Sequence, residues 1–505
     1  MVTGFARTHA VGLHGVHGHL IEVEAHLAHG LPNFIITGLG DTAVVQARDR
    51  VRAAVVNSDQ PWPPHRTTVG LSPAWLPKRG SAYDLAVAIA VLSAAGCLDM
   101  EASPGTAFCA ELGLDGRLRP VQGVLPAIMA AVRAGCTRVV VPHIQAPEAA
   151  LVPGARVIGA TDLREVVGVL RGEVRPRAPQ AIADVPPTKS PCISEVAGQE
   201  IGRLAMEVAA AGGHHVAFFG PPGAGKTLLA ERLPGLLPRL TDEQALEVTA
   251  LHSIAGKGTV IPGLMRVPPF QAPHHTATSA ALVGGGAGVA QPGALSLAHH
   301  GVLFLDEATE FAARTLDALR EPLERQEVTL ARAGGVVTYP AQVQLVLAAN
   351  PCPCGAGGQQ QCECGPSVRR RYLGRLSVPL LDRIDIQVTL PPVSAASLYD
   401  QNGRETTAQV AARVEQARSA AAARWAKKTW DVNARVSAHA LRADFRLPMK
   451  VSSELDRALE QGLVSARGYD RVLRVAWTLA DLSGRSMPVR EDIALALAMR
   501  LRTLA

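Results

Sequence analysis

Aromatic side chains are scarce in this sequence of 505 residues, where Phe, Trp and Tyr together make up 4%. Its hydrophobic cores must therefore be built mainly from Ala, Val and Leu. The composition, 48% hydrophobic and 19% charged, excludes a wholly disordered chain. One core does not suffice at this length, so we expect two to four domains.

Cysteine and long apolar runs are also in short supply. The chain holds eight cysteines, too few for a disulfide-stapled scaffold. Its longest uncharged apolar run, at residues 85–98, is too short to cross a bilayer and predicts a buried helix. The first residues show neither the charged nor the apolar region of a signal peptide. We therefore expect a soluble, cytoplasmic protein with no membrane partner.

One stretch dominates what is present. Residues 220–227 read GPPGAGKT, the G-x-x-x-x-G-K-T pattern of a phosphate-binding loop. Glycines let backbone N–H groups surround a phosphate, and the helix that follows adds the positive end of its dipole. An apolar run before the loop and a helical run after it argue against a merely structural glycine turn. The predicted ATP-binding residues are Gly220, Pro221, Pro222, Gly223, Ala224, Gly225, Lys226, Thr227 and Leu228.

The residues needed for hydrolysis follow two further apolar runs. Lys226 is expected to reach the β- and γ-phosphates, and Thr227 to ligate Mg²⁺. The run at 302–305 ends in Asp306 and Glu307, which would hold Mg²⁺ and polarise the attacking water, respectively. The run at 344–349 ends in Asn350, which could position the same water. A solvated acidic strand end and an asparagine that only forms a turn are the alternatives.

Composition divides the chain into four regions. Residues 1–170 mix short apolar runs with helical stretches, and residues 171–192 contain five prolines, typical of an extended linker. In residues 193–392, buried-looking strands alternate with helical stretches, which predicts a doubly wound α/β fold with a mostly parallel sheet. Residues 393–505 are predicted to be helical.

The order of these motifs resembles that of the AAA+ ATPases. Four further segments resemble the magnesium-chelatase-like branch: FQAPHHT at 270–276, LVGGG at 282–286, SLAHHG at 296–301 and NPCPCG at 350–355. With the N-terminal region included, the whole chain is similar to the ComM (YifB) competence protein family. The resemblance implies an AAA+ core with a C-terminal helical lid, ATP and Mg²⁺ as cofactors, and a homo-hexamer.

The resemblance also implies an arginine finger. Arg383, in the segment LLDRID at 380–385, matches the arginine that reaches a neighbouring subunit's γ-phosphate. An arginine supplied in trans stabilises the charge of the transition state and requires a ring or a filament. The alternative is a salt bridge from Arg383 to Asp382 or Asp385.

Two more positions follow from the resemblance. Arg467 matches the lid arginine that senses the nucleotide, although Arg471 and Arg474 compete for that role. Val196 lies in the segment EVAGQ at 195–199, which matches the segment that packs near the base.

The N-terminal region resembles the Lon protease domain. Ser81, in the segment 78–84, lies near the position of the Lon nucleophile. In the segment that carries the Lon lysine, this chain has Leu125, or Pro126 with a shift of one residue. A Ser–Lys dyad needs an amine that takes the serine proton. We therefore predict a Lon-like fold without peptidase activity, serving in assembly or in guiding a substrate.

The cysteines that are present cluster. Cys352, Cys354, Cys362 and Cys364 form C-x-C-x₇-C-x-C, and two close thiol pairs suit a structural, tetrahedral Zn²⁺ site. Because C-x-C is less typical of zinc sites than C-x₂-C, thiols in a loop without metal are the alternative. The histidines at 274, 275, 299 and 300 lack a ligand spacing and are not predicted to form a second metal site.

These observations lead to two hypotheses about function. By family resemblance, the first is a hexameric, ATP-driven DNA motor, a branch-migration helicase that extends heteroduplex during natural transformation. Single-stranded and branched DNA, and other recombination proteins, would be its partners. The net charge of +6 permits an anionic partner, and Lys257, Arg266 and Arg332 are predicted to contact phosphates unless they are merely solvated. The second is a chelatase-like or chaperone-like remodeller that never touches DNA.

Overall fold

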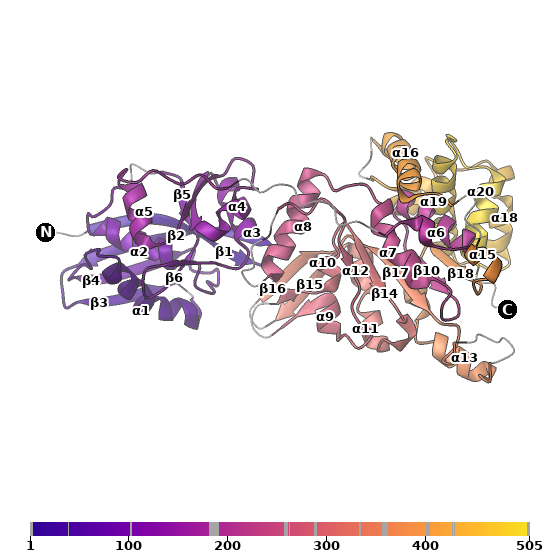
Figure 1. The fold of residues 1–505 in the computed structure, drawn as a ribbon, viewed down its shortest axis with the longest axis horizontal. Coiled ribbons are helices and arrows are strands. Elements are labelled where there is room, and N and C mark those ends of the chain that lie inside the picture. The colour runs from indigo at the N-terminus through magenta and orange to yellow at the C-terminus, as the bar shows by residue number, and fades with distance from the viewer. Residues whose placement is uncertain are drawn as a thin grey trace.

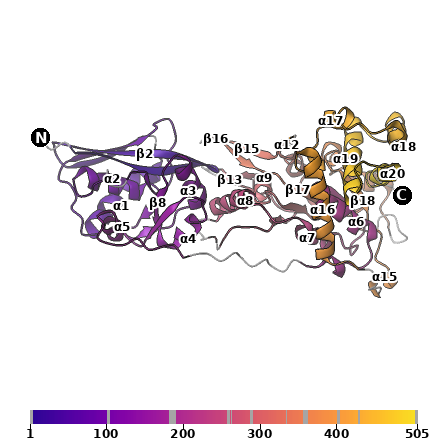
Figure 2. The same cartoon turned by 90° about the horizontal axis from the view of Figure 1, so that it is seen from above.

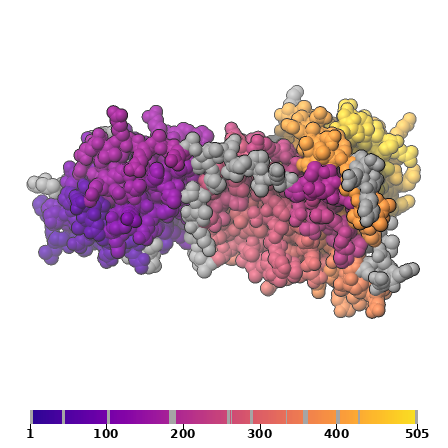
Figure 3. Space-filling view, viewed as in Figure 1, coloured from indigo at the N-terminus to yellow at the C-terminus, as the bar shows by residue number. Residues whose placement is uncertain are grey.

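Three parts of the molecule follow one another along its long axis (Figure 1). The computed structural model describes residues 4–38, 40–100, 104–180, 191–256, 261, 263–286, 290–332, 335–355, 362–399, 404–426, 428 and 430–501. The N-terminal region forms one end and the C-terminal helices the other, and the space-filling view shows the same elongated outline (Figure 3). Lys257 and residues 181–190 of the predicted linker lie outside the described residues.

The N-terminal part is built on a seven-stranded sheet in the order β3-β4-β2-β1-β5-β8-β9. Helix α2 spans Asp84–Ala94, and ten of its eleven residues are buried, which confirms the buried helix predicted near residues 85–98. The sheet strands are β1 (Gly4–His14), β2 (His17–Ala28), β3 (Asn33–Thr37), β4 (Arg66–Ser72), β5 (Thr106–Phe108), β8 (Arg138–Pro142) and β9 (Arg156–Ala160). The other elements are α1 (Thr42–Asn57), β6 (Glu111–Leu112), β7 (Leu118–Arg119), α3 (Val124–Arg133), α4 (Ala146–Ala149) and α5 (Leu163–Leu170).

The central part contains a five-stranded sheet in the order β11-β14-β17-β10-β18, in which every pairing is parallel. This finding confirms the predicted parallel α/β sheet. Its strands are β10 (Val216–Phe219), β11 (Phe270–Gln271), β14 (Val302–Leu305), β17 (Gln344–Ala349) and β18 (Ile386–Thr389). β10 is an interior strand between β17 and β18. The phosphate-binding loop follows it at the carboxyl edge of the sheet, where ligands of such folds bind.

Helices cover both faces of this sheet, so its strands are apolar throughout. Val216 and Phe218 of β10 pack with α6 (Glu200–Gly212) and α7 (Lys226–Leu236), whereas Ala217 and Phe219 pack into a second cluster on the opposite face. The remaining helices of this part are α8 (Asp242–Ala255), α9 (Ser279–Val283), α10 (Ala294–Leu297), α11 (Ala313–Asp317), α12 (Arg320–Arg325), α13 (Pro366–Leu373) and α14 (Val378–Leu381). The short strand pair β12 (Gly284–Gly285) and β13 (Gln291–Pro292) lies in the insertion before β14.

The C-terminal part is helical, as predicted, and shares its core with one face of the parallel sheet. Several of the scarce aromatic residues gather here: Trp425 is fully buried, with its ring 4.6 Å from that of Phe445 and 6.0 Å from that of Trp477. The helices are α15 (Ala395–Tyr399), α16 (Thr407–Trp425), α17 (Ala438–Arg442), α18 (Met449–Glu460), α19 (Ala466–Leu482) and α20 (Arg490–Ala498). No helix within the described residues is long and apolar enough to cross a membrane.

The N-terminal part docks on the central part beside α8 (Figure 2). Gly123 N–H donates to the carbonyl of Ser253 at 3.3 Å, and the Ser253 hydroxyl donates to buried Glu148 at 2.6 Å. A second contact joins the tip of β1–β2 to the hairpin of β15 (Glu327–Arg332) and β16 (Gly335–Pro340), where the His14 ring nitrogen lies 2.8 Å from the carbonyl oxygen of Val336. The strands β15 and β16 pair antiparallel over Glu327–Arg332 and Gly335–Pro340.

Candidate nucleotide-binding and hydrolysis site

The loop at 220–227 joins β10 to α7 and is shaped by its glycines. Gly223 and Gly225 have φ angles of +76° and +83°, in the left-handed region that side chains disfavour. A Cβ added at either position would meet no atom within 4 Å. The glycines therefore serve the backbone conformation, and the space beside them is open.

Lys226 is buried under this loop and folded back toward its backbone. Its ammonium group donates to the carbonyls of Gly220 at 2.7 Å and Pro221 at 2.9 Å, and to Asn350 Oδ1 at 3.0 Å. Burial lowers the pKa of Lys226, while the negative charges of Asp306 and Glu307 oppose that shift. Phosphate oxygens would compete with the two carbonyls for this cation.

Thr227 and Asp306 lie together as the predicted Mg²⁺ ligands. The Thr227 hydroxyl donates to Asp306 Oδ2 at 2.8 Å, across the gap between α7 and the end of β14. Hydroxyl and carboxylate oxygens are the donors that Mg²⁺ prefers, so this pair fits the ion chemically.

Glu307 has a backbone conformation that is rare for a residue with a side chain. Its φ is +48°, and its N–H donates to Asp306 Oδ1 at 2.9 Å. Its carboxylate Oε2 lies 3.2 Å from His275 Nδ1. Strained backbone of this kind is common at functional sites. The half-exposed carboxylate has His275 as its partner, and its negative charge opposes the lowering of the Lys226 pKa that burial causes. The sequence pattern did not predict this contact between His275 and Glu307, although the adjacent histidines at 274 and 275 marked the segment as a candidate.

Arg383 lies at the opposite edge of the sheet from the phosphate-binding loop. It precedes β18, whereas the loop follows β10, and the two strands are parallel neighbours. A four-residue strand is about 13 Å long, which separates the two edges. Arg383 Nη2 pairs with Glu324 at 2.6 Å, and Nη1 donates to the Pro379 carbonyl at 2.7 Å.

The carboxylates proposed as alternative partners of Arg383 pair with other arginines. Asp382 pairs with Arg500 at 3.1 Å, and buried Asp385 pairs with Arg471 at 2.5 Å. The salt-bridge reading of the sequence thus names the wrong partners, because Glu324 lies on α12, far from Arg383 in the chain.

Arg383 lines an arginine-rich cleft of about 410 Å³, which lies between the amino edge of the sheet and the C-terminal helices. Arg471 and Arg474 line it as well, and burial lowers the pKa of Arg474. Arg467 is exposed in the first turn of α19 and is not among the residues that line the cleft. The geometry therefore groups Arg471 and Arg474 with Arg383, and the choice of Arg467 as the lid sensor stays a prediction.

Val196 is buried in the core beside α7. The segment around it is held to that helix by a salt bridge of 2.5 Å between Glu195 and Arg232. Its predicted place near the base stays a prediction.

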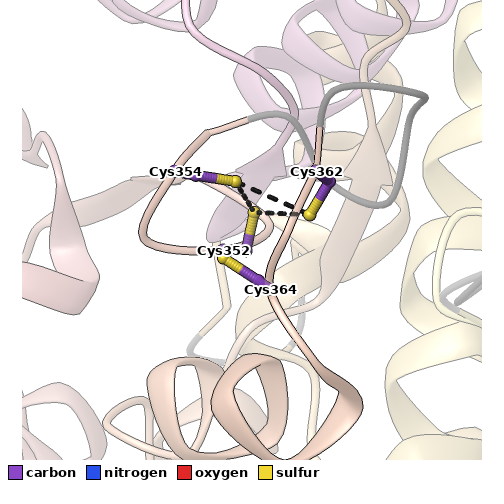
Figure 4. A group of neighbouring side chains, drawn as sticks. All are labelled: Cys352, Cys354, Cys362 and Cys364. Atoms are coloured by element: carbon purple, nitrogen blue, oxygen red, sulfur yellow. Dashed lines mark hydrogen bonds between the residues drawn. The ribbon is translucent and has the colours of Figure 1, made fainter.

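Two clusters outside this site could hold a metal ion by their composition. The four predicted cysteines gather, with their sulfurs within 4.8 Å of one another (Figure 4). In the second cluster, His299 and His300 lie with their Nε2 atoms 3.3 Å and 3.1 Å from Glu247 Oε2. His299 Nδ1 accepts from the Gln342 N–H, so Nε2 carries the proton and donates to Glu247. These hydrogen bonds lower the pKa of Glu247 to about 2 and account for the second cluster without a metal.

Comparison with known proteins settles the family. Three family profiles match in succession: "Subunit ChlI of Mg-chelatase" over residues 23–145, "Magnesium chelatase, subunit ChlI" over 192–398 and "Magnesium chelatase, subunit ChlI C-terminal" over 404–500. Competence protein ComM of Haemophilus influenzae is 39% identical over 492 residues, which cover 96% of this chain and 95% of that protein. The chain belongs to the magnesium chelatase-like ComM/YifB family. Such proteins are AAA+ ATPases, for which ATP and Mg²⁺ are the cofactors.

Two further relatives match nearly the whole chain and about a third of it, respectively. An uncharacterized protein of Mycobacterium tuberculosis is 50% identical over 494 residues, 98% of both chains. A Lon protease of Mycolicibacterium smegmatis is 28% identical over 175 residues, which are 34% of this chain and 21% of that protein. In the structure the Ser81 hydroxyl donates to Glu111, and Leu125 is buried. The Lon-like assignment and the loss of peptidase activity remain predictions.

Proposed function

We propose that the protein is a hexameric ATP-driven DNA motor, a branch-migration helicase in homologous recombination during natural transformation. The observation that carries the proposal is the separation of Arg383 from the phosphate-binding loop of its own chain. An arginine at the amino edge of the sheet cannot serve a γ-phosphate at the carboxyl edge. It can serve the nucleotide of a neighbouring copy, and a closed ring gives every copy such a neighbour.

The charge of the cleft around Arg383 supports action in trans. Six arginines line it against three carboxylates, so it has a surplus of cations. Arg418 and Arg435 are partly buried there, and burial lowers the pKa of Arg418 to about 10 and lowers that of Arg435. A polyphosphate presented by another subunit would relieve the surplus charge through charge-assisted hydrogen bonds.

The choice of DNA as substrate rests on the name of the relative ComM and on the β15–β16 hairpin. Arg332 is exposed at the end of β15, where it would contact phosphates without reading bases. Arg266 pairs with Asp242 at 2.5 Å, which makes it a weaker candidate for a phosphate contact than the sequence suggested.

A second candidate function is remodelling of a protein, in the manner of a chelatase motor subunit or a chaperone. One observation favours it: the magnesium-chelatase 38 kDa subunit of Rhodobacter capsulatus is 25% identical over 335 residues, 87% of its own length.

The rate of ATP hydrolysis in the presence of DNA decides between the two functions. If the proposal holds, single strands, forks and four-way junctions stimulate hydrolysis, the stimulation fades steeply as salt rises, and the protein migrates junctions. Lys226→Ala serves as the inactive control. Hydrolysis that is indifferent to every DNA would overturn the proposal in favour of the remodeller.

A further inference from the structure

The four-cysteine cluster has the dimensions of a zinc site. Three sulfur separations are 3.2 Å between Cys352 and Cys354, 3.7 Å between Cys352 and Cys362, and 3.6 Å between Cys354 and Cys362. Four sulfurs placed about 2.3 Å from Zn²⁺ at tetrahedral corners lie about 3.8 Å apart. All eight cysteines fall within the described residues and are thiols. Figure 4 shows the side chains of the cluster converging on one point from two short segments.

The first segment of the cluster is part of the wall of the nucleotide site. Cys352 is fully buried and stands two residues after Asn350, which accepts the hydrogen bond from Lys226. Gly355 follows Cys354 with φ +79°, and a Cβ added there would lie 2.7 Å from Pro222 of the phosphate-binding loop. A displacement of this segment would therefore reach both Asn350 and Pro222.

The second segment connects the cluster to the catalytic carboxylates. Cys364 is followed by Gly365, the N-cap of α13. Just beyond α13, Arg375 Nη1 donates to the Thr309 carbonyl at 2.9 Å and to Glu310 at 3.2 Å. Those two residues belong to the turn that begins at Glu307. The chain that leaves the cluster at Cys364 thus runs through α13 to Arg375, which binds the turn after β14.

We propose that a Zn²⁺ ion held by Cys352, Cys354, Cys362 and Cys364 acts as a positioning brace for the nucleotide site. Four thiolates fill the tetrahedral coordination shell of the ion and leave no position open for a substrate, so its role is structural. Loading of the cluster fixes Asn350 against Lys226 and the 352–355 turn against Pro222. Removal of the ion returns the four side chains to thiols that share no common ligand, so the turn loses this anchor. The inference rests on the nucleotide site described above, but it is independent of DNA.

The first measurement is metal content. The full-length protein should carry about one Zn²⁺ per chain by atomic emission, and the double variant Cys362→Ser/Cys364→Ser should carry none. Cys97→Ser, a change at a cysteine of the N-terminal part, is the matched control and should keep the metal. Lys226→Ala should also keep it, so loss of nucleotide binding and loss of metal are separable. Wild-type protein that neither contains Zn²⁺ nor takes it up on titration would overturn the proposal.

The second measurement is the affinity for a fluorescent, non-hydrolysable ATP analogue. Wild type stripped of metal with a thiol-modifying reagent and EDTA, then reduced, should bind it about tenfold more weakly, the effect of losing one charge-assisted hydrogen bond. Adding Zn²⁺ back should restore the affinity, and this reconstitution keeps the test valid if the double variant fails to fold. Equal affinities with and without Zn²⁺ would show that the ion does not brace the site.

Discussion

Glu307 is placed by one backbone angle and one neighbour. Its left-handed φ turns the side chain out of the strand direction, and His275 lies 3.2 Å from its carboxylate. The histidine comes from the insertion before β14, so it joins the hydrolysis site only through the fold. We infer that it positions the carboxylate.

Substitution of His275 should therefore affect turnover more than binding. We expect His275→Ala to lower kcat for ATP about tenfold, with KM unchanged, because the carboxylate loses a hydrogen-bond partner. His275→Gln should recover part of the rate, since an amide N–H can replace the ring nitrogen. Glu307→Gln removes the carboxylate itself and should lower kcat about a hundredfold or more. Steady-state kinetics check the prediction, and a rise in KM at constant kcat would contradict it.

At the scale of elements, the sequence predicted the longer strands of the central sheet, because strands that are buried on both faces appear as continuous apolar runs. The runs at 216–219 and 302–305 coincide with β10 and β14, and the run at 344–349 with β17. Asn350, Asp306 and the loop could thus be predicted to meet at one edge. The two-residue strand β11 carries no such signal, and the pairing of Arg383 with Glu324 depends on the packing of α12 beside the sheet edge. Local pattern does not specify contacts of that kind.

The amino edge of the sheet should make stability depend on pH. His215 precedes β10, and its Nδ1 accepts the Leu345 N–H at 3.0 Å. Burial lowers the pKa of His215 from 6.5 to about 4. Between those values the unfolded chain binds more protons than the folded one, so stability falls as pH drops from 6.5 toward 4. Asn at this position does not titrate and still accepts the hydrogen bond.

We expect wild type to lose about 1 kcal/mol more stability than His215→Asn between pH 7.5 and 5.5. Denaturant unfolding at the two pH values measures the difference. His439→Asn, a change at an exposed histidine of α17, should behave as wild type. Equal losses of stability in wild type and His215→Asn would show that His215 does not cause the pH dependence.

At the scale of the whole molecule, the two predicted halves of the hydrolysis site lie at opposite edges of the central sheet. Lys226 lies at the carboxyl edge of the sheet and Arg383 at the amino edge. A chain that lacks either half can therefore be rescued by a neighbour that has it, provided that the proposed ring forms.

Mixing two inactive variants tests this arrangement. Lys226→Ala and Arg383→Ala should each hydrolyse ATP at less than about a hundredth of the wild-type rate. In an equal mixture, about a quarter of the interfaces pair an intact loop with an intact arginine, so about a quarter of the activity should return. Glu321→Ala, a change at an exposed residue of α12 near Arg383, is the control and should hydrolyse ATP at the wild-type rate on its own. A mixture as inactive as its components would exclude catalysis between subunits.

The contact between the β1–β2 tip and the β15–β16 hairpin bears on how such a machine moves. His14 reaches the Val336 carbonyl, and Gly15 packs so closely on Val337 that a Cβ would collide with it. The β15–β16 hairpin is thus held by residues of the N-terminal part. In the proposed ring, any movement of a β15–β16 hairpin would move the N-terminal part of the same chain with it. The N-terminal parts would then take part in the motion of the ring instead of remaining fixed.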